Sequence, residues 1–249
     1  MAKDDWQSEA GDDDRDRKPS VLTRLVEKAA VALRADADME TVLKAYQAFD
    51  PDAIEKCTVE QARAQPTVAD AVRAVLREQG REQDPERLVP GVVAQDLEIP
   101  GAAGPMRARL YRPAVEGRLP GVLYLHGGGW VLADLDVYDL SARGLAAQSR
   151  AIVLSIDYRR APEAKFPAAW HDALAAWRWL VLNAASLSVD PDRLAIAGES
   201  AGGCLALATA VSLRDLHDDL LPPPRHVLAI YPVAQTGSLA TPSYIENAL

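Results

Sequence analysis

After residue 90, the hydrophobic positions of this chain fall into short, continuously apolar runs separated by longer stretches with a helical period. Unbroken apolar runs are typical of parallel strands that helices cover on both faces. The runs span residues 122–125, 151–156, 194–197 and 227–231, and the helical stretches span residues 137–149, 166–183 and 200–216. Their regular alternation predicts an α/β fold with a mostly parallel, doubly wound sheet.

Two further strands are expected before these runs. Residues 92–99 and 106–111 carry strand-like patterns on either side of the segment Pro100-Gly101-Ala102-Ala103-Gly104. Proline and glycine between two strand patterns favour a tight reversal of the chain. We therefore expect a hairpin at one edge of the sheet.

Residues 21–80 show helical periodicity instead. Apolar residues within 22–33 recur at spacings of three and four, which traces one stripe of a helix. A second helix is expected over residues 39–49. The block carries no set of catalytic residues, and we interpret it as a helical cap or lid.

Capping signals predict two more helices in this block. Thr58 with Gln61 has the pattern of a capping box that opens a short third helix. Thr67 can cap a fourth helix, and Gly80 is placed to end it.

The chain thus divides into three parts. Residues 1–20 are polar and acidic without periodic apolar positions, which predicts a disordered tail. Residues 21–88 are expected to form the helical cap, and residues 89–249 the α/β core. A length of 249 residues suits one such domain with an appendage.

Composition and charge argue against several classes of protein. The net charge is -9 and no basic stripe is visible, so nucleic acid is not an expected partner. No apolar stretch resembles a membrane span or a signal peptide, which predicts a cytoplasmic location.

Of the two cysteines, Cys204 is expected to be a small buried thiol, and no disulfide, metal or cofactor is expected. A homodimer is compatible with the sequence.

The segment Gly198-Glu199-Ser200-Ala201-Gly202 has the pattern G-x-S-x-G between an apolar run and a helical stretch. A serine at such a junction can occupy a strained turn that lifts its hydroxyl clear of the backbone, and Gly198 and Gly202 leave that turn uncrowded. A helix N-cap is the alternative interpretation of Ser200. The flanking glycines favour a nucleophile, and the Ala201 amide can point toward a developing oxyanion.

The segment His126-Gly127-Gly128-Gly129-Trp130 directly follows another apolar run. Three consecutive glycines are entropically costly for a simple turn, which favours a function that needs bare amides. We therefore expect Gly127, Gly128 and Gly129 to form an oxyanion hole with Ala201. Trp130 is expected to wall the substrate pocket or to join the core.

Three motifs now stand in order along the chain. They read HGGGW at residues 126–130, DYRRAPE followed by FPAA within 157–169, and GESAGG at 198–203. Together they resemble the motifs of the hormone-sensitive-lipase-like carboxylesterases of the α/β-hydrolase fold. The resemblance covers roughly residues 21–249, the helical cap included.

This resemblance implies a set of roles. It implies that Gly128 and Gly129 join Ala201 in the oxyanion hole, that the substrates are short- to medium-chain acyl esters, and that no cofactor is needed. It implies structural roles for His126 and for residues 157–163. Glu199 stands where the family more usually has aspartate, and we take it as a tolerated variant.

The chain departs from the family where the catalytic triad should be completed. In this fold the triad runs Ser, then Asp or Glu, then His, and only 49 residues follow Ser200. His126 lies in the glycine loop itself. His217 lies about 25 Å along the helix opened by Ser200, at 1.5 Å per residue. His226 begins a strand and so is expected at the opposite end of the sheet.

His171 lies nearer the expected site. It stands in the first turn of its helix, but with Trp170 and Asp172 it is expected on the ordinary helix surface. Geometry must precede pKa in assigning a base. We therefore expect the acid and the base of the triad to be absent from these 249 residues.

Two interpretations follow. In the first, the chain is the N-terminal part of a carboxylic ester hydrolase whose C-terminal strands are missing, and Ser200 forms the acyl-enzyme. In the second, it is a ligand-binding or regulatory pseudoenzyme of the same fold, as the gibberellin receptor is. Truncation is favoured because the chain ends without strands that would cover the sheet edge. The sequence does not name the physiological substrate.

Overall fold

The computed structural model describes residues 36–218 and 220–234. The acidic tail expected over residues 1–20 and the helix expected within 22–33 therefore lie outside the described residues. The division into tail, cap and core stays a prediction.

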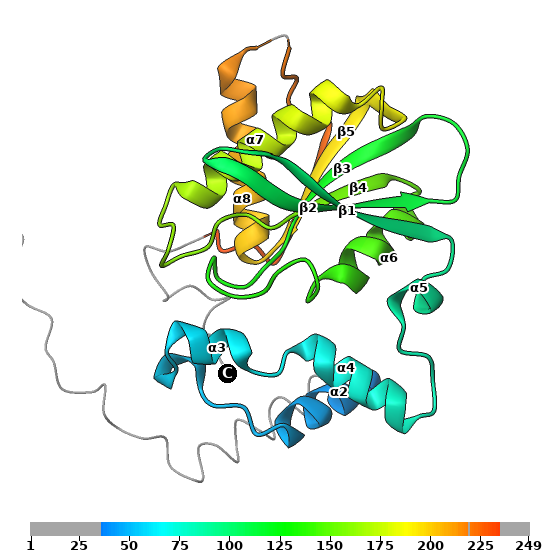
Figure 1. The fold of residues 1–249 in the computed structure, drawn as a ribbon, viewed down its shortest axis with the longest axis vertical. Helices are drawn as coiled ribbons and strands as arrows, with labels where there is room; N and C mark the ends of the chain where they lie inside the picture. The colour runs from blue at the N-terminus through cyan, green and yellow to red at the C-terminus, as the bar shows by residue number, and fades with distance from the viewer. Residues whose placement is uncertain (1–35, 219, 235–249) are drawn as a thin grey trace, which may run out of the picture.

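A six-stranded sheet forms the centre of the molecule, in the order β1-β2-β4-β3-β5-β6 (Figure 1). The strands are β1 (Val92–Gly101), β2 (Gly104–Pro113), β3 (Leu119–Leu125), β4 (Ile152–Ile156), β5 (Val189–Glu199) and β6 (His226–Ile230). Strands β4, β3, β5 and β6 run parallel, whereas β1 and β2 pair antiparallel and β2 joins β4 antiparallel. The mostly parallel sheet and the edge hairpin are as the sequence predicted.

Helices cover both faces of the sheet, which explains the unbroken apolar runs. Helix α6 (Asp139–Ser149) packs on one face, over a cluster that contains Tyr111 and Tyr124. Helices α7 (Ala168–Asn183) and α8 (Ala201–Leu216) pack on the other face, over a larger cluster.

The N-terminal helices are short, and each of the α-helices among them begins with a side-chain cap. They are α2 (Ala37–Ala48), η1 (Ile54–Lys56), α3 (Val59–Ala64), α4 (Val68–Glu78) and α5 (Pro85–Leu88). Both expected capping signals are confirmed, since Thr58 and Thr67 each form a complete capping box. The chain turns after α4 at Gly80, whose φ of +63° favours glycine. Helix α5 was not predicted from the sequence; Asp84 caps it and Pro85 occupies its first turn.

These N-terminal helices lie at one end of the sheet. Figure 1 shows α2, α3 and α4 as a layer facing the end at which β5 passes into α8. Helix α2 packs on α4. No helix in the described part of the chain has both the length and the apolar character needed to cross a membrane.

The expectation that Asp172 lies on the ordinary helix surface is wrong. Its side chain is only 2% exposed, and it accepts hydrogen bonds from the Arg159 guanidinium at 2.8 and 3.0 Å and from the Arg159 amide at 3.0 Å. The Ala102 amide of the β1–β2 turn donates to it at 3.1 Å. A buried carboxylate needs such partners, and Asp172 therefore ties α7 to the hairpin and to the loop after β4.

We predict that Asp172→Ala lowers the free energy of unfolding by about 2–3 kcal/mol, because it leaves an arginine and a backbone amide without their acceptor. Urea unfolding followed by circular dichroism measures this change. Asp215→Ala is the matched control, since Asp215 pairs with Arg214 on the surface, and it should leave the midpoint unchanged. Equal midpoints for the two variants would contradict the prediction.

Candidate active site

The register of two neighbouring strands brings the two sequence motifs together. Strands β3 and β5 are parallel, and Leu125 of β3 lies level with Gly198 of β5. His126 directly follows Leu125, and Glu199 directly follows Gly198. The glycine loop and the G-x-S-x-G turn therefore leave the sheet side by side, at the edge where parallel strands of α/β folds end.

Ser200 occupies a strained turn between β5 and α8. Its φ is 52° and its ψ is −117°, and its side chain does not cap the helix. Positive φ in a residue other than glycine stores strain that the surrounding structure must hold. Here the Ser200 amide donates to the Ile230 carbonyl at 2.9 Å, at the end of β6. The geometry favours the nucleophile-elbow interpretation over a helix N-cap.

The elbow glycines are needed because backbones pack directly against them. A Cβ on Gly202 would overlap the carbonyl oxygens of Leu125 and His126, and a Cβ on Gly198 would overlap Gly202 itself. The start of α8 is thus in van der Waals contact with the end of β3. No side chain fits between the elbow and the glycine loop.

The three glycines of the loop have different surroundings. A Cβ on Gly127 would lie 2.5 Å from the Tyr138 hydroxyl and 3.1 Å from the Glu199 carbonyl oxygen. Gly128 has φ +113°, and a Cβ there would overlap the Leu132 carbonyl. Gly129 has φ +60° with open space around its Cβ position. Gly127 is therefore required for close packing, Gly128 for packing and conformation, and Gly129 for conformation.

Several backbone amides at this edge have no acceptor within residues 36–218 and 220–234. Those of Gly128, Gly129 and Ala201 are among them. Ala201 opens α8, whose N-terminal end favours negative charge. Unpaired amides are costly when buried and useful where a charge develops. That all three converge on the Ser200 hydroxyl stays a prediction.

Glu199 has partners that the sequence did not indicate. Its carboxylate accepts hydrogen bonds from the Tyr124 hydroxyl, on β3, and from the Tyr231 hydroxyl at 2.7 Å, beyond β6. Burial, with the bond to Glu199, raises the pKa of both tyrosines, which keeps them protonated as donors. The residue before the nucleophile therefore links three strand ends.

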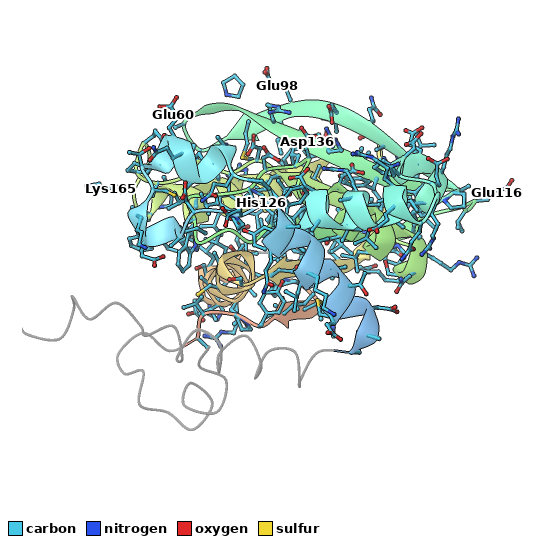
Figure 2. The ribbon with its side chains drawn as sticks, turned by 90° about the horizontal axis from the view of Figure 1, so that it is seen from below. Glu60, Glu98, Glu116, His126, Asp136 and Lys165 are labelled. Atoms are coloured by element: carbon cyan, nitrogen blue, oxygen red, sulfur yellow. The ribbon has the colours of Figure 1, made fainter. Side chains whose placement is uncertain are left out.

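His126 is fully buried. Its ring stacks on Tyr158 with centroids 4.3 Å apart, and its Nδ1 lies 2.7 Å from the Gly127 carbonyl oxygen. Burial lowers the pKa of His126, so the ring stays neutral. Seen from the side of the N-terminal helices in Figure 2, His126 is labelled near the middle of the molecule. Its contacts suit a structural role in the loop.

Trp130 is half-buried and packs against the larger core cluster. Its carbonyl accepts a hydrogen bond from the Ala161 amide at 2.8 Å. This bond joins the end of the glycine motif to the loop after β4. The packing of Trp130 on the core cluster agrees with the core alternative, and the pocket-wall alternative stays a prediction.

The remaining histidines lie away from Ser200. His217 follows the last residue of α8, about 25 Å along the helix axis. His226 pairs level with Ala195, about 16 Å before Ser200 along the strand direction. His171 is exposed on α7 and packs against Trp170 at 5.4 Å between ring centroids. Among the described residues, no side chain forms a hydrogen bond with the Ser200 hydroxyl.

No group of three or more His, Cys, Asp or Glu side chains in the described ranges could hold a metal ion. The two cysteines are free, and the half-buried Cys204 thiol donates to the Val233 carbonyl at 2.9 Å. Burial raises the pKa of Cys204, so it is not a thiolate nucleophile near neutral pH.

A protein-family model described as alpha/beta hydrolase fold matches residues 122–248. The chain belongs to the α/β-hydrolase fold family. The esterase LipI of Mycobacterium tuberculosis is 40% identical over 185 residues, which are 73% of this chain and 56% of LipI. An ethyl acetate hydrolase of Pseudomonas putida is 45% identical over 52% of this chain and 41% of its own length. These relatives confirm the resemblance to hormone-sensitive-lipase-like carboxylesterases.

Solved esterase structures share the fold. An esterase of Pyrobaculum calidifontis superimposes with a TM-score of 0.64 at 39% identity, over 78% of this chain and 59% of the esterase. A thermostable carboxylesterase from a metagenomic library gives a TM-score of 0.65 at 36% identity, over 78% of this chain and 62% of its own. The chain therefore spans about three fifths of the length of these relatives.

We predict that Gly202→Ala lowers the free energy of unfolding by about 3 kcal/mol, because the added methyl group forces the elbow away from β3. Gly144→Ala in α6 is the control, since a Cβ there meets nothing within 4 Å. It should be neutral or stabilise the protein by up to about 1 kcal/mol. Thermal and urea unfolding measure both variants, and a Gly202→Ala protein as stable as Gly144→Ala would refute the close packing.

Proposed function

We propose that this protein hydrolyses carboxylic esters with short- to medium-chain acyl groups through an acyl-enzyme on Ser200. The observation that carries the proposal is the strained serine turn, locked against a glycine loop with unpaired amides. Relatives named esterase, carboxylesterase and ethyl acetate hydrolase support the reaction class.

In the proposed reaction, the Ser200 oxygen attacks the ester carbonyl carbon. The carbonyl oxygen becomes an oxyanion and accepts hydrogen bonds from the amides of Gly128, Gly129 and Ala201. One such donor typically lowers the barrier by about 3 kcal/mol. The alcohol leaves with a proton, and water then attacks the acyl-enzyme to release the carboxylic acid and restore the serine.

The Ser200 hydroxyl needs a base to accept its proton. We propose that the triad acid and base are not among the residues described above, because the His126 ring is buried against Tyr158 and the other three histidines lie away from Ser200. The relatives support this assignment, since each extends well beyond the part that this chain matches. The alternative function is a ligand-binding pseudoenzyme. It is favoured because no histidine among the described residues forms a hydrogen bond with the Ser200 hydroxyl.

The N-terminal helices are proposed to shape the substrate pocket. A cavity of about 320 Å³ lies between them and the segment after the glycine loop. Apolar residues line it from both sides, namely Tyr46, Ile54 and Pro66 from the N-terminal part and Leu132 and Val137 from the segment, and the charged Arg63, Asp134 and Arg160 line it as well. A cavity of this size suits a small ligand, which agrees with a preference for short acyl chains.

We predict slow, Ser200-dependent hydrolysis of p-nitrophenyl acetate by the 249-residue chain. Without a base to take its proton, the Ser200 hydroxyl is a weak nucleophile, so we expect its acylation to run far more slowly than with a complete triad. Release of p-nitrophenolate by the wild type and by Ser200→Ala measures the effect, with His171→Ala as the control that should retain the wild-type rate. Butyrate should react faster than palmitate.

Two outcomes would contradict this proposal. Binding of acyl esters without release of p-nitrophenolate above the Ser200→Ala rate would favour the pseudoenzyme. Rapid turnover that disappears in His171→Ala would show that the base lies within the described fold.

A further inference from the structure

The segment that follows the glycine motif is held by three arginines from three different parts of the chain. Arg63 of α3 donates to the Val131 carbonyl at 2.8 Å. Arg160, after β4, donates to the Ala133 carbonyl. Arg109 of β2 pairs with the Asp136 carboxylate at 2.9 Å. Only Arg63 comes from the N-terminal helices.

Arg63 is fixed by more than this one bond. Its guanidinium forms a two-point ion pair with Glu163, at 2.7 and 2.9 Å, and also donates to the Ala161 carbonyl at 3.0 Å. The bond with Arg63 holds the pKa of Glu163 down to about 2, so the carboxylate stays charged at neutral pH. The planar fork of arginine suits such a set of acceptors, and lysine does not reproduce it. Arg63 thereby joins α3 to two loops of the sheet edge.

A chain of peptide groups leads from Arg63 to the oxyanion loop. The carbonyl of Val131, which accepts from Arg63, shares a planar peptide group with the Leu132 amide. That amide donates to the Gly128 carbonyl at 2.8 Å, and the Val131 amide donates to the same carbonyl at 3.0 Å. The Gly128 carbonyl in turn shares a planar peptide group with the Gly129 amide. In a trans peptide the N–H points opposite to the C=O, so these bonds fix the direction of the Gly129 N–H.

We propose that Arg63 is a positioning residue for the oxyanion hole, acting on the Gly129 amide through the Val131–Leu132 and Gly128–Gly129 peptide groups. Each hydrogen bond in such a chain polarises the next, so the guanidinium charge also makes the Gly129 N–H a stronger donor. The catalytic part of this inference rests on the proposed ester hydrolysis, whereas the orientation of the loop does not.

Hydrogen exchange of the glycine loop tests the orientation without any need for turnover. In the 249-residue chain, Arg63→Met should speed amide exchange in peptides that cover residues 127–132 by about tenfold or more, because the Val131–Leu132 peptide group is no longer held by Arg63 and the Leu132 bond to the Gly128 carbonyl opens more often. The control is Arg73→Met, which removes an arginine of α4 that pairs with Asp70 at 2.8 Å within its own helix. It should leave this exchange unchanged.

The reactivity of Ser200 tests the catalytic part. Modification by diethyl 4-nitrophenyl phosphate forms a bond from the serine oxygen to phosphorus and releases p-nitrophenolate, and its rate can be followed by absorbance. Arg63→Met should lower this rate and the kcat for p-nitrophenyl acetate about 10- to 100-fold, with KM little changed, because the donor acts on the transition state. Glu163→Gln keeps both carbonyl contacts of Arg63 and should lower the rates less than threefold.

The outcomes separate this inference from the proposed function. Loop exchange in Arg63→Met can be measured even where the wild-type Ser200 proves unreactive. Faster loop exchange in the variant would then support the positioning role, while the unreactive serine would overturn ester hydrolysis. Unchanged loop exchange and unchanged Ser200 reactivity in Arg63→Met would overturn the positioning role. Where Arg63→Met does not fold, Arg63→Lys serves in the same measurements, since it keeps the charge and removes the fork.

Discussion

The parallel pairing of β3 with β5 is the constraint on which the site depends. Because Leu125 lies level with Gly198, two loops far apart in the sequence emerge from the sheet in contact. The backbones then approach so closely that only glycine fits at positions 198 and 202, and the Tyr138 hydroxyl leaves no room for a side chain at position 127. The strain at Ser200 is held by the sheet on one side and α8 on the other.

The charges around this edge are arranged to support the backbone rather than to react. Glu199 accepts hydrogen bonds from two tyrosine hydroxyls, on β3 and just after β6. Asp172 accepts hydrogen bonds from an arginine side chain and from two backbone amides. Arg63, Arg109 and Arg160 hold successive points of the segment after the glycine loop. A loop of glycines has no side chains of its own to pack, so the direction of its amides must be set by such neighbours.

The fold class, the sheet with its hairpin, the capped helices α3 and α4, and the two candidate site motifs could all be read from the sequence. Each depends on local information: the period of apolar residues, a capping pair three residues apart, or glycines around a serine. The register between β3 and β5 was not in the sequence, but the carboxyl ends of parallel strands share an edge in any such sheet.

Only the tertiary structure decided the burial of Asp172, the tyrosine partners of Glu199 and the contacts of Arg63. Asp172 has the local pattern of a surface residue, and its burial follows from a hairpin turn 70 residues away in sequence. Arg63 contacts partners about 100 residues downstream. Long-range contacts of polar side chains leave no periodic signal, because the energy that fixes them comes from partners brought together by folding. The sequence thus determined the helices, the strands and the two candidate site motifs. Folding determined which polar side chains hold those motifs in place.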